Sequence, residues 1–390
     1  AFSHDNKGFY YNRYPAVGTV PKEDEHYYAK VYWHEFNTSQ DKDVLVYEDN
    51  SNKDLGFAPI ITDDGKYLLL YIWHGASSKN RLYYREVKNR KSFVKLFSAE
   101  DAEYDFIYNV GKTFYIKTDL NAPKGKMIAV DLNKPDPKFF KDIIIEQEDV
   151  ISQAQVINKQ LIVSYLKDAH NILKVYQLDG KPVREISLPN LGTLSGITGA
   201  HNESEMFYGF TSFLYPPTIF RYDLKTNVSS VFQQPNITFN VNDYQTEQVF
   251  YHSKDNTKVP MFLTYKKGLE KKGDNPTLLY GYGGFKINIT PTFSASRIVW
   301  LEHGGIFAVA NLRGGNEYGE EWHKKGMLEN KQNVFNDFIS AAEYLIENKF
   351  TNSKKLAING GSNGGLLVAA TLVQRPDLFG AAVSQVPVID

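Results

Sequence analysis

The feature of this 390-residue chain that most constrains its fold is an internal repeat with a step of 46 residues. Tyr84, Val130, Tyr176 and Tyr222 are spaced by that step, and each lies in a short apolar segment closed by an acidic residue or Gln. A looser copy around Tyr32 lies 52 residues before Tyr84. Repeats of about 40 to 50 residues that hold several strands are typical of β-propeller blades. The alternative is a β-sandwich with accidental spacing, which three equal steps disfavour.

Each repeat contains a second expected strand, upstream of the first. These strands lie at residues 67–72, 113–116, 160–165 and 205–210, and their aromatic and β-branched residues suit half-buried antiparallel strands. We therefore expect about five blades up to residue 235, within a β-propeller domain of residues 1–238. The chain opens in a strand-like segment, which leaves two interpretations: a five-bladed propeller, or further blades before Ala1.

The pattern changes after residue 244, where strands begin to alternate with helices. Two apolar segments first flank the polar turn Ser253-Lys254-Asp255-Asn256, which indicates a hairpin. Alternation of strand and helix is typical of a parallel sheet with crossover helices, so residues 239–390 are predicted to form an α/β domain. The expected strands are 249–252, 259–265, 277–280, 305–311, 356–359 and 380–388, and the expected helices are 333–349 and one from about 364.

A glycine-rich motif lies between the strand at 356–359 and the helix that follows it. Residues 359–365 read Asn-Gly-Gly-Ser-Asn-Gly-Gly and contain G-x-S-x-G in the strand–turn–helix context of a nucleophile elbow. A phosphate-binding loop is excluded because no Lys-Ser/Thr follows, and a dinucleotide-binding motif is excluded by the glycine spacing. The domain is thus predicted to be an α/β-hydrolase with Ser362 as its nucleophile.

Two groups are candidates for stabilising an oxyanion beside that serine. The backbone N–H of Asn363 stands at the start of a helix, where it is free to donate. A second glycine cluster, residues 280–285, follows an earlier strand, where this hydrolase class places its other oxyanion donor. Tyr282 in that cluster offers a phenolic O–H, although a plain turn with packed tyrosines is the alternative. Arg313-Gly314-Gly315, after the strand at 305–311, is interpreted as structural.

A serine hydrolase also needs a base and an orienting acid, which follow the nucleophile in this fold. All nine histidines precede Ser362, and the only acids after it are Asp377 and Asp390. The sheet also has about half of its expected strands. We therefore expect both domains to be incomplete in this chain and the triad Asp and His to lie beyond Asp390. A catalytically silent protein is the competing interpretation.

Composition narrows the other classes of function. A net charge of −1, from 44 basic and 45 acidic residues, argues against binding to nucleic acid or a membrane surface. The absence of Cys excludes a disulfide framework, thiolate metal sites and a cysteine nucleophile in these residues. No apolar run approaches the roughly 18 residues of a membrane span. The sequence predicts a cytoplasmic monomer without a cofactor or a metal.

Together these motifs resemble the prolyl oligopeptidase (prolyl endopeptidase) family. The resemblance runs through the whole chain and is strongest from residue 244 onward. Gly361 distinguishes the chain from oligopeptidase B, which usually has Arg before the nucleophile, and from dipeptidyl peptidase IV relatives, which usually have Trp there. The motifs that carry it are Tyr282-Gly283-Gly284-Phe285, Arg313-Gly314-Gly315 with Tyr318-Gly319, residues 333–338, and Gly360-Gly361-Ser362-Asn363-Gly364-Gly365.

The resemblance implies a seven-bladed propeller that covers the active site and admits short peptides only, with two blades before Ala1. It implies a serine endopeptidase that cleaves on the carboxyl side of proline through an acyl-enzyme on Ser362. The family's triad Asp and His, its proline-stacking Trp and a substrate-binding Arg would all lie beyond Asp390.

The resemblance also implies roles for residues of this chain. The Asn363 amide and the Tyr282 hydroxyl would form the oxyanion hole. Phe285 and Asn363 would line the proline pocket, which Val388 would also reach. A rigid ring without an N–H is best recognised by a flat apolar slot, and Phe285 can form one wall of it.

One propeller segment departs from the family pattern. Trp73 stands where the family commonly has Arg, and Ala76 stands where it commonly has Cys. These positions face the cavity in relatives, so Trp73 is either a substrate-binding residue or a core aromatic. The alternatives to a prolyl endopeptidase are a related oligopeptidase or acylaminoacyl peptidase with another preference, and a non-catalytic propeller–hydrolase that binds proteins.

Overall fold

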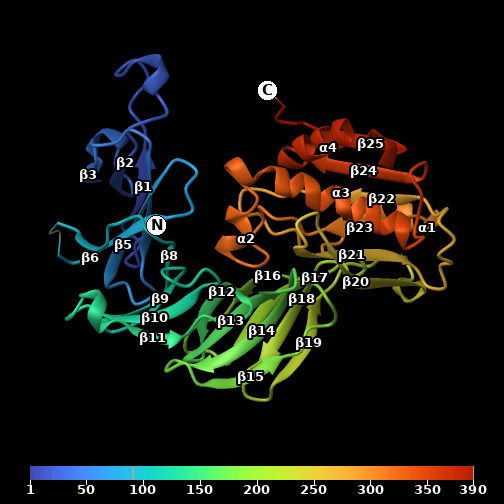
Figure 1. Cartoon of the computed structure of the whole chain (residues 1–390). Coiled ribbons are helices and arrows are strands. Elements are labelled where there is room, and N and C mark those ends of the chain that lie inside the picture. Colours follow the sequence, from blue (N-terminus) through green and yellow to red (C-terminus); the bar gives the residue numbers. More distant parts are fainter. Residues whose placement is uncertain (90–91, 390) are drawn as a thin grey trace. The chain divides into compact units, whose positions relative to one another are not determined.

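The computed structural model describes residues 1–89 and 92–389. The chain separates into two compact units, Ala1–Glu146 and Gln147–Asp390, and each is described by itself (Figure 1). The described residues form five small antiparallel sheets and one larger mixed sheet. A β-propeller fused to an α/β domain, as expected from the repeat and from the strand–helix alternation, is therefore confirmed.

The first unit contains three of the small sheets, each built from strands that are neighbours in sequence. Its short 3₁₀ helices are Lys22–Asp24, Gln40–Lys42 and Pro137–Phe139. The strands are β1 (Gly8–Arg13), β2 (Lys30–Glu35) and β3 (Val44–Tyr47); β4 (Leu55–Ile61), β5 (Tyr67–His74), β6 (Asn80–Glu86) and β7 (Val94–Phe97); β8 (Tyr104–Val110), β9 (Thr113–Thr118), β10 (Lys126–Asp131) and β11 (Lys141–Ile144).

The second unit begins with two more four-stranded sheets of the same kind. Their strands are β12 (Val150–Ile157), β13 (Gln160–Lys167), β14 (His170–Gln177) and β15 (Pro182–Ile186); β16 (Thr193–Thr198), β17 (Glu205–Thr211), β18 (Thr218–Asp223) and β19 (Val228–Gln233).

The 46-residue repeat has a direct structural meaning. Its marker residues Tyr84, Val130, Tyr176 and Tyr222 lie on β6, β10, β14 and β18, each the third strand of a four-stranded sheet. All four are at most 9% exposed, because each packs into the core on one side of its sheet. The second strands expected from sequence are β5, β9, β13 and β17, so both strand series are confirmed.

The larger sheet has six strands in the order β20-β21-β23-β22-β24-β25. β21 pairs antiparallel with β20 and β23, and the pairs from β23 to β25 are parallel. The elements are β20 (Tyr244–His252), β21 (Lys258–Lys266), β22 (Thr277–Tyr280), α1 (Ala295–Glu302), β23 (Ile306–Ala310), α2 (Glu320–Lys324), α3 (Gln332–Glu347), β24 (Leu356–Gly361), α4 (Asn363–Gln374) and β25 (Ala381–Gln385), with 3₁₀ turns at Val241–Asp243, Leu328–Asn330 and Pro376–Leu378.

Apolar clusters cover both faces of this sheet. On one face α3 and α4 pack against the strands through residues such as Phe338 and Leu367, both fully buried. On the other face α1 packs through Ile298 and Leu301 against Phe307. All six strands expected from sequence are present, as are the helices at α3 and α4, whereas α1 and α2 were not predicted.

Parallel pairing of β22 with β24 positions the functional loops. Tyr280 lies opposite Asn359 in the register, so both strands end at the same edge of the sheet. The loop of residues 281–285 and the turn at 361–363 leave from that edge side by side. This is the edge at which open α/β sheets bind their ligands.

Within the second unit, the blade sheets share a core with the α/β part. Phe213, in the turn after β17, packs against Phe262 and Phe307 of the six-stranded sheet. The Tyr318 hydroxyl donates a 2.7 Å hydrogen bond to the Asp168 carboxylate at the tip of the β13–β14 hairpin. The predicted domain boundary after residue 238 falls between β19 and β20 and stays a prediction. Among the described residues, no helix has the length and apolarity needed to cross a membrane.

Candidate active site

Ser362 occupies a sharp turn between β24 and α4. Its φ of 55° and ψ of −118° place it in a backbone conformation that side-chain-bearing residues rarely adopt. Three hydrogen bonds hold the turn: Ser362 N–H donates to the Gln385 carbonyl at 2.9 Å, and the Ser362 carbonyl accepts from Gly365 and Leu366 at 2.9 and 3.1 Å. The serine is exposed to solvent. This is the geometry of a nucleophile elbow.

The glycine after the elbow lets two loops approach each other. A Cβ at Gly364 would lie 2.7 Å from the Gly281 carbonyl oxygen, too close for any real side chain. The first turn of α4 therefore rests directly on the loop that follows β22. A residue larger than glycine at this position would separate the two loops.

Asn363 connects these loops through its side chain. It is 5% exposed, and its Nδ2 donates a 2.6 Å hydrogen bond to the Tyr282 carbonyl. As the first residue of α4, Asn363 has a backbone N–H without an acceptor inside the helix. The structure thus brings together Ser362, the free N–H of Asn363 and Tyr282, which is half-buried.

Lys331 also belongs to this arrangement and was not predicted. Its Nζ donates to the Gly283 carbonyl at 2.9 Å and to Asn363 Oδ1 at 3.0 Å. Burial lowers the pKa of the Lys331 ammonium. Nothing in the sequence singles out this lysine, because it lies 32 residues before Asn363 and immediately precedes α3.

The other predicted site residues are less enclosed. Phe285, on the same loop as Tyr282, is 69% exposed and has a φ of 55°. Val388 follows β25 and is 62% exposed. Trp73 lies on β5 in the first unit, half-buried, with its indole covering the backbone of Gly56. The structure therefore groups Phe285 with the Tyr282 loop and does not relate Trp73 to Ser362.

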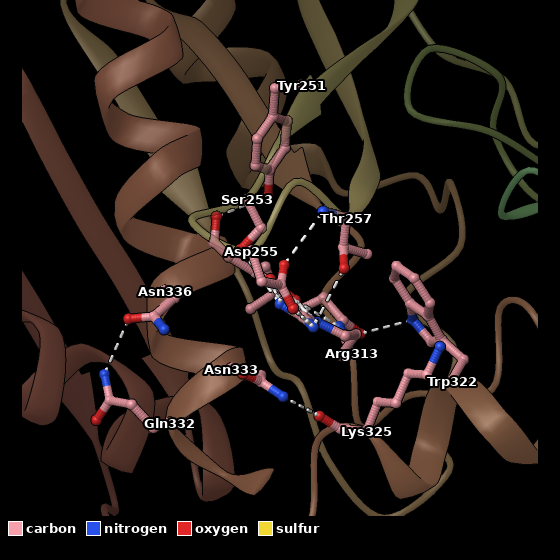
Figure 2. Close-up of polar contacts among 12 residues, drawn as sticks. Tyr251, Ser253, Asp255, Thr257, Arg313, Trp322, Lys325, Gln332, Asn333 and Asn336 are labelled. Atoms are coloured by element: carbon pink, nitrogen blue, oxygen red, sulfur yellow. Dashed lines mark hydrogen bonds and ion pairs between the residues drawn. The ribbon is translucent and has the colours of Figure 1, made fainter.

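A buried ion-pair cluster anchors the loop after β23, which contains Arg313-Gly314-Gly315. Arg313 is 1% exposed, and Figure 2 shows its guanidinium facing Asp255 and Thr257. Arg313 Nη1 bonds Asp255 Oδ2 at 2.5 Å, and Nη2 bonds Asp337 Oδ1 at 2.5 Å. Hydrogen bonding to the guanidinium lowers the pKa of Asp255 to about 2, while burial raises that of Asp337. The cluster links the β20–β21 turn, the loop after β23 and α3.

The loop that Arg313 anchors directly contacts the loop of residues 281–285. A Cβ at Gly314 would lie 2.7 Å from the Gly283 carbonyl oxygen, and Lys286 N–H donates to the Gly314 carbonyl at 3.1 Å. This placement fits the structural interpretation of Arg313-Gly314-Gly315. The acidic partners Asp255 and Asp337 were not predicted, because their meeting depends on contacts across 58 and 24 residues.

The same loop carries a buried acid, Glu317. It is 1% exposed, and its Oε1 accepts a 3.0 Å hydrogen bond from the Ile289 N–H. Burial raises the pKa of Glu317 to about 7. The group is therefore largely neutral at slightly acidic pH.

A cavity of about 650 Å³ lies on the α1 face of the sheet. Tyr280, Arg297, Trp300 and Phe307 are among its lining residues, and Ser362 is not. Burial lowers the pKa of Arg297 to about 10. The cavity is separate from the elbow and takes no part in the chemistry considered below.

The geometry of the site fits Ser362 as the predicted nucleophile, with the predicted oxyanion donors beside it. In residues 1–89 and 92–389, no histidine hydrogen-bonds to Ser362; His323, for example, contacts the Gly314 carbonyl at 2.8 Å. The catalytic roles of these residues stay predictions, and the described contacts contain no general base for Ser362.

Comparison with known proteins gives consistent matches along the chain. A family model described as "Prolyl oligopeptidase, N-terminal beta-propeller domain" matches residues 1–235, and one described as "Prolyl oligopeptidase family" matches residues 291–390. A prolyl endopeptidase of Elizabethkingia meningoseptica is 41% identical over 389 residues, which is 99% of this chain and 54% of the relative. The chain spans about half the length of the curated relatives it matches.

Solved structures agree with these matches. A structure from a study of two prolyl endopeptidases superposes with a TM-score of 0.93 at 41% identity, covering 100% of this chain and 57% of that one. Prolyl oligopeptidase B of Galerina marginata, bound to a 25-residue macrocyclization substrate, gives a TM-score of 0.94 at 36% identity, with 100% and 55% coverage.

Proposed function

The chain belongs to the prolyl oligopeptidase family, and we propose on that premise that the full-length protein is a serine endopeptidase that cleaves short peptides on the carboxyl side of proline. The single observation that carries the proposal is the strained turn at Ser362, with a φ of 55°. A fold keeps such a conformation where it presents a reactive group.

The reaction would proceed by acyl transfer through Ser362. Its Oγ attacks the carbonyl carbon of the scissile bond while the hydroxyl proton passes to a general base. The carbonyl oxygen becomes an oxyanion that accepts hydrogen bonds from the Asn363 N–H and the Tyr282 hydroxyl. Collapse of this intermediate breaks the C–N bond, the amine leaves with the proton from the base, and water then hydrolyses the ester in the reverse manner.

The base and its orienting acid are proposed to lie in the part of the full-length protein beyond Asp390. Support comes from the fold, because the histidine and acid of an α/β-hydrolase follow the nucleophile in sequence.

Selection of proline is proposed to come from an apolar slot beside the elbow. Phe285, on the Tyr282 loop, is exposed and can form one wall, and Val388 after β25 can contribute another apolar surface. Burial of a rigid ring in such a slot discriminates by about 1–3 kcal/mol. A contribution of Trp73 beyond the proline position, a cytoplasmic location and a monomeric state remain predictions.

A peptide with one internal proline, one arginine and one alanine tests the proposal. The full-length protein is incubated with it, and mass spectrometry identifies the bond that is cut. We expect cleavage after proline, lost in Ser362→Ala, which should also lose covalent labelling by an organophosphonate. Cleavage after arginine would favour a related oligopeptidase. A folded wild-type protein that neither cleaves nor becomes labelled would favour a non-catalytic binding protein.

A further inference from the structure

Lys331 is a cation that contacts both halves of the proposed oxyanion hole. Its Nζ donates to the Gly283 carbonyl in the loop after β22, and to Asn363 Oδ1 in the first turn of α4. Both hydrogen bonds, at 2.9 and 3.0 Å, have ordinary lengths for an ammonium donor. No other side chain among the described residues has recorded hydrogen bonds to both of these elements.

The ammonium determines how the Asn363 amide is oriented. An ammonium can only donate, so the amide must turn its oxygen toward Lys331. Its NH₂ group is then left to donate to the Tyr282 carbonyl, at 2.6 Å. The amide packs against Gly284, where an added Cβ would lie 2.6 Å from that NH₂ group, so only glycine fits beside it. Lys331, at the start of α3, is thus connected to the Tyr282 carbonyl through the Asn363 amide.

The charge of Lys331 is not neutralised by a neighbouring acid. Within the part of the chain that the structure describes, no carboxylate forms an ion pair with Lys331, and its partners are a carbonyl and an amide oxygen. A partly buried cation without a counter-ion is costly for stability. Such a cost is typical of functional sites, where positive charge stabilises negative charge that develops during the reaction.

We propose that Lys331 is a positioning residue for the reaction of Ser362: it holds the Tyr282 loop and the Asn363 turn in register, so that their two donors converge on the oxyanion. The inference rests on the proposed function. It assigns Lys331 an effect on the transition state rather than on binding of the substrate, because its contacts are with the oxyanion loops.

Replacement of Lys331 by Met tests the proposal in the full-length protein. Met keeps most of the aliphatic stem and removes the donors and the charge. With a fluorogenic post-proline peptide, we expect kcat to fall by about 10- to 100-fold, less than the 10²–10³-fold loss of an oxyanion donor itself. We expect KM to change less than about twofold, since the loss falls on the transition state. A matched control is Lys324→Met, because Lys324 is exposed and forms an ion pair with Glu321 in the preceding turn.

Chemical rescue separates positioning from folding. The 390 residues contain no Cys, so Lys331→Cys introduces the only thiol in this part of the protein. Alkylation with bromoethylamine rebuilds an ammonium of nearly the same length. We expect the alkylated Lys331→Cys protein to have at least a fivefold higher kcat than the unmodified Lys331→Cys protein. This comparison tests the proposal even if Lys331→Met does not fold. Failure of the aminoethylated protein to regain activity while Ser362 still reacts with an organophosphonate would contradict the proposal.

The two hypotheses fail in different ways. If the wild-type protein cleaves after proline and Lys331→Met keeps kcat within about twofold, the positioning role is wrong and the proposed function stands. If the wild-type protein neither cleaves nor reacts with the organophosphonate, the proposed function is wrong and the positioning role falls with it. A rise in KM at constant kcat would place Lys331 in substrate binding instead.

Discussion

Glu317 shows how much a single side chain can couple this site to pH. The carboxyl is 1% exposed, and burial raises its pKa from 4.5 to about 7. Between these two values the folded protein holds a proton that the unfolded chain has released. The free energy of unfolding therefore falls as the pH rises from about 4.5 to about 7, and is then level with respect to this group. The loss amounts to roughly 3 kcal/mol, at about 1.4 kcal/mol for each pKa unit.

Glu317→Gln should remove this part of the pH dependence. Gln has nearly the same shape and cannot ionise, so its burial costs the same at every pH. We expect denaturant unfolding of the full-length protein to show the wild type losing stability between pH 5 and pH 8, relative to the variant. The two proteins should differ most above pH 7, where the wild type must bury a charge. If the difference in unfolding free energy between the two proteins stays constant from pH 5 to pH 8, Glu317 is ionised in the folded protein throughout this range.

Among individual residues, the sequence predicted the sharp turn at Ser362 and missed the side chains that support it. Ser362, Asn363 and Tyr282 could be singled out because short motifs determine their spacing and their secondary structure, and their catalytic roles stay predictions. Lys331 and Asp337 belong to no such motif, since their partners lie 32 and 24 residues away in sequence. Such contacts depend on how α3 packs on the sheet, which a single sequence does not reveal.

Among the elements, strand prediction succeeded where strands alternate regularly between core and surface. β9 is an example, with its inward residues Phe114 and Ile116 fully buried. α1 has only eight residues, and α2 has five and begins after Gly319, which has a φ of 87°. Elements this short show too few turns for a helical period to be recognised. Their ends also depend on tertiary contacts, such as the Trp300 indole bond to the Ile306 carbonyl at 2.9 Å.

The contact between α4 and the loop after β22 gives a prediction that two neighbouring glycines can test. Gly364→Ala would place a methyl group 2.7 Å from the Gly281 carbonyl, and we expect it to lower the melting temperature by several degrees. Gly361→Ala adds the same methyl group where the nearest atom is 3.7 Å away, an ordinary contact. Its melting temperature should stay within about two degrees of the wild type. Equal changes in melting temperature for the two variants would mean that α4 and the loop after β22 can move apart without loss of stability.

At the scale of the whole molecule, compactness and sequence pattern divide the chain differently. The periodicity of strands changes near residue 240, where β19 gives way to β20. The compact units instead separate after Glu146, because the sheets of β12–β19 share a core with the α/β part. The sequence pattern indicates which strands and helices form. A shared core depends instead on the packing of individual side chains such as Phe213, which no periodicity identifies. The family resemblance was correct because its motifs lie in loops at the ends of strands.

This shared core predicts which parts of the chain unfold together. Phe213 is 2% exposed, and its ring lies 5.7 Å from Phe262 and 5.8 Å from Phe307, measured between centroids. Phe213→Ala should cost about 3–5 kcal/mol by leaving a cavity. Hydrogen exchange should then accelerate both in β16–β19 and in β21 and β23, although the substitution lies in the propeller part. Faster exchange confined to β16–β19 would show that the α/β part is stable without this contact.

A matched substitution in the first unit completes the test. Phe114 on β9 is fully buried among Tyr67, Tyr84 and Phe106, with ring centroids 5.0 to 5.6 Å away. Phe114→Ala removes the same side chain, so its cost should be similar. Because the buried residues of its cluster all lie between Tyr67 and Val130, we expect faster exchange in Ala1–Glu146 and little change around Ser362. The six-stranded sheet should therefore be sensitive to a propeller substitution only where the propeller residue shares a core with that sheet, as Phe213 does. Equal sensitivity to both substitutions would contradict a division of the chain after Glu146.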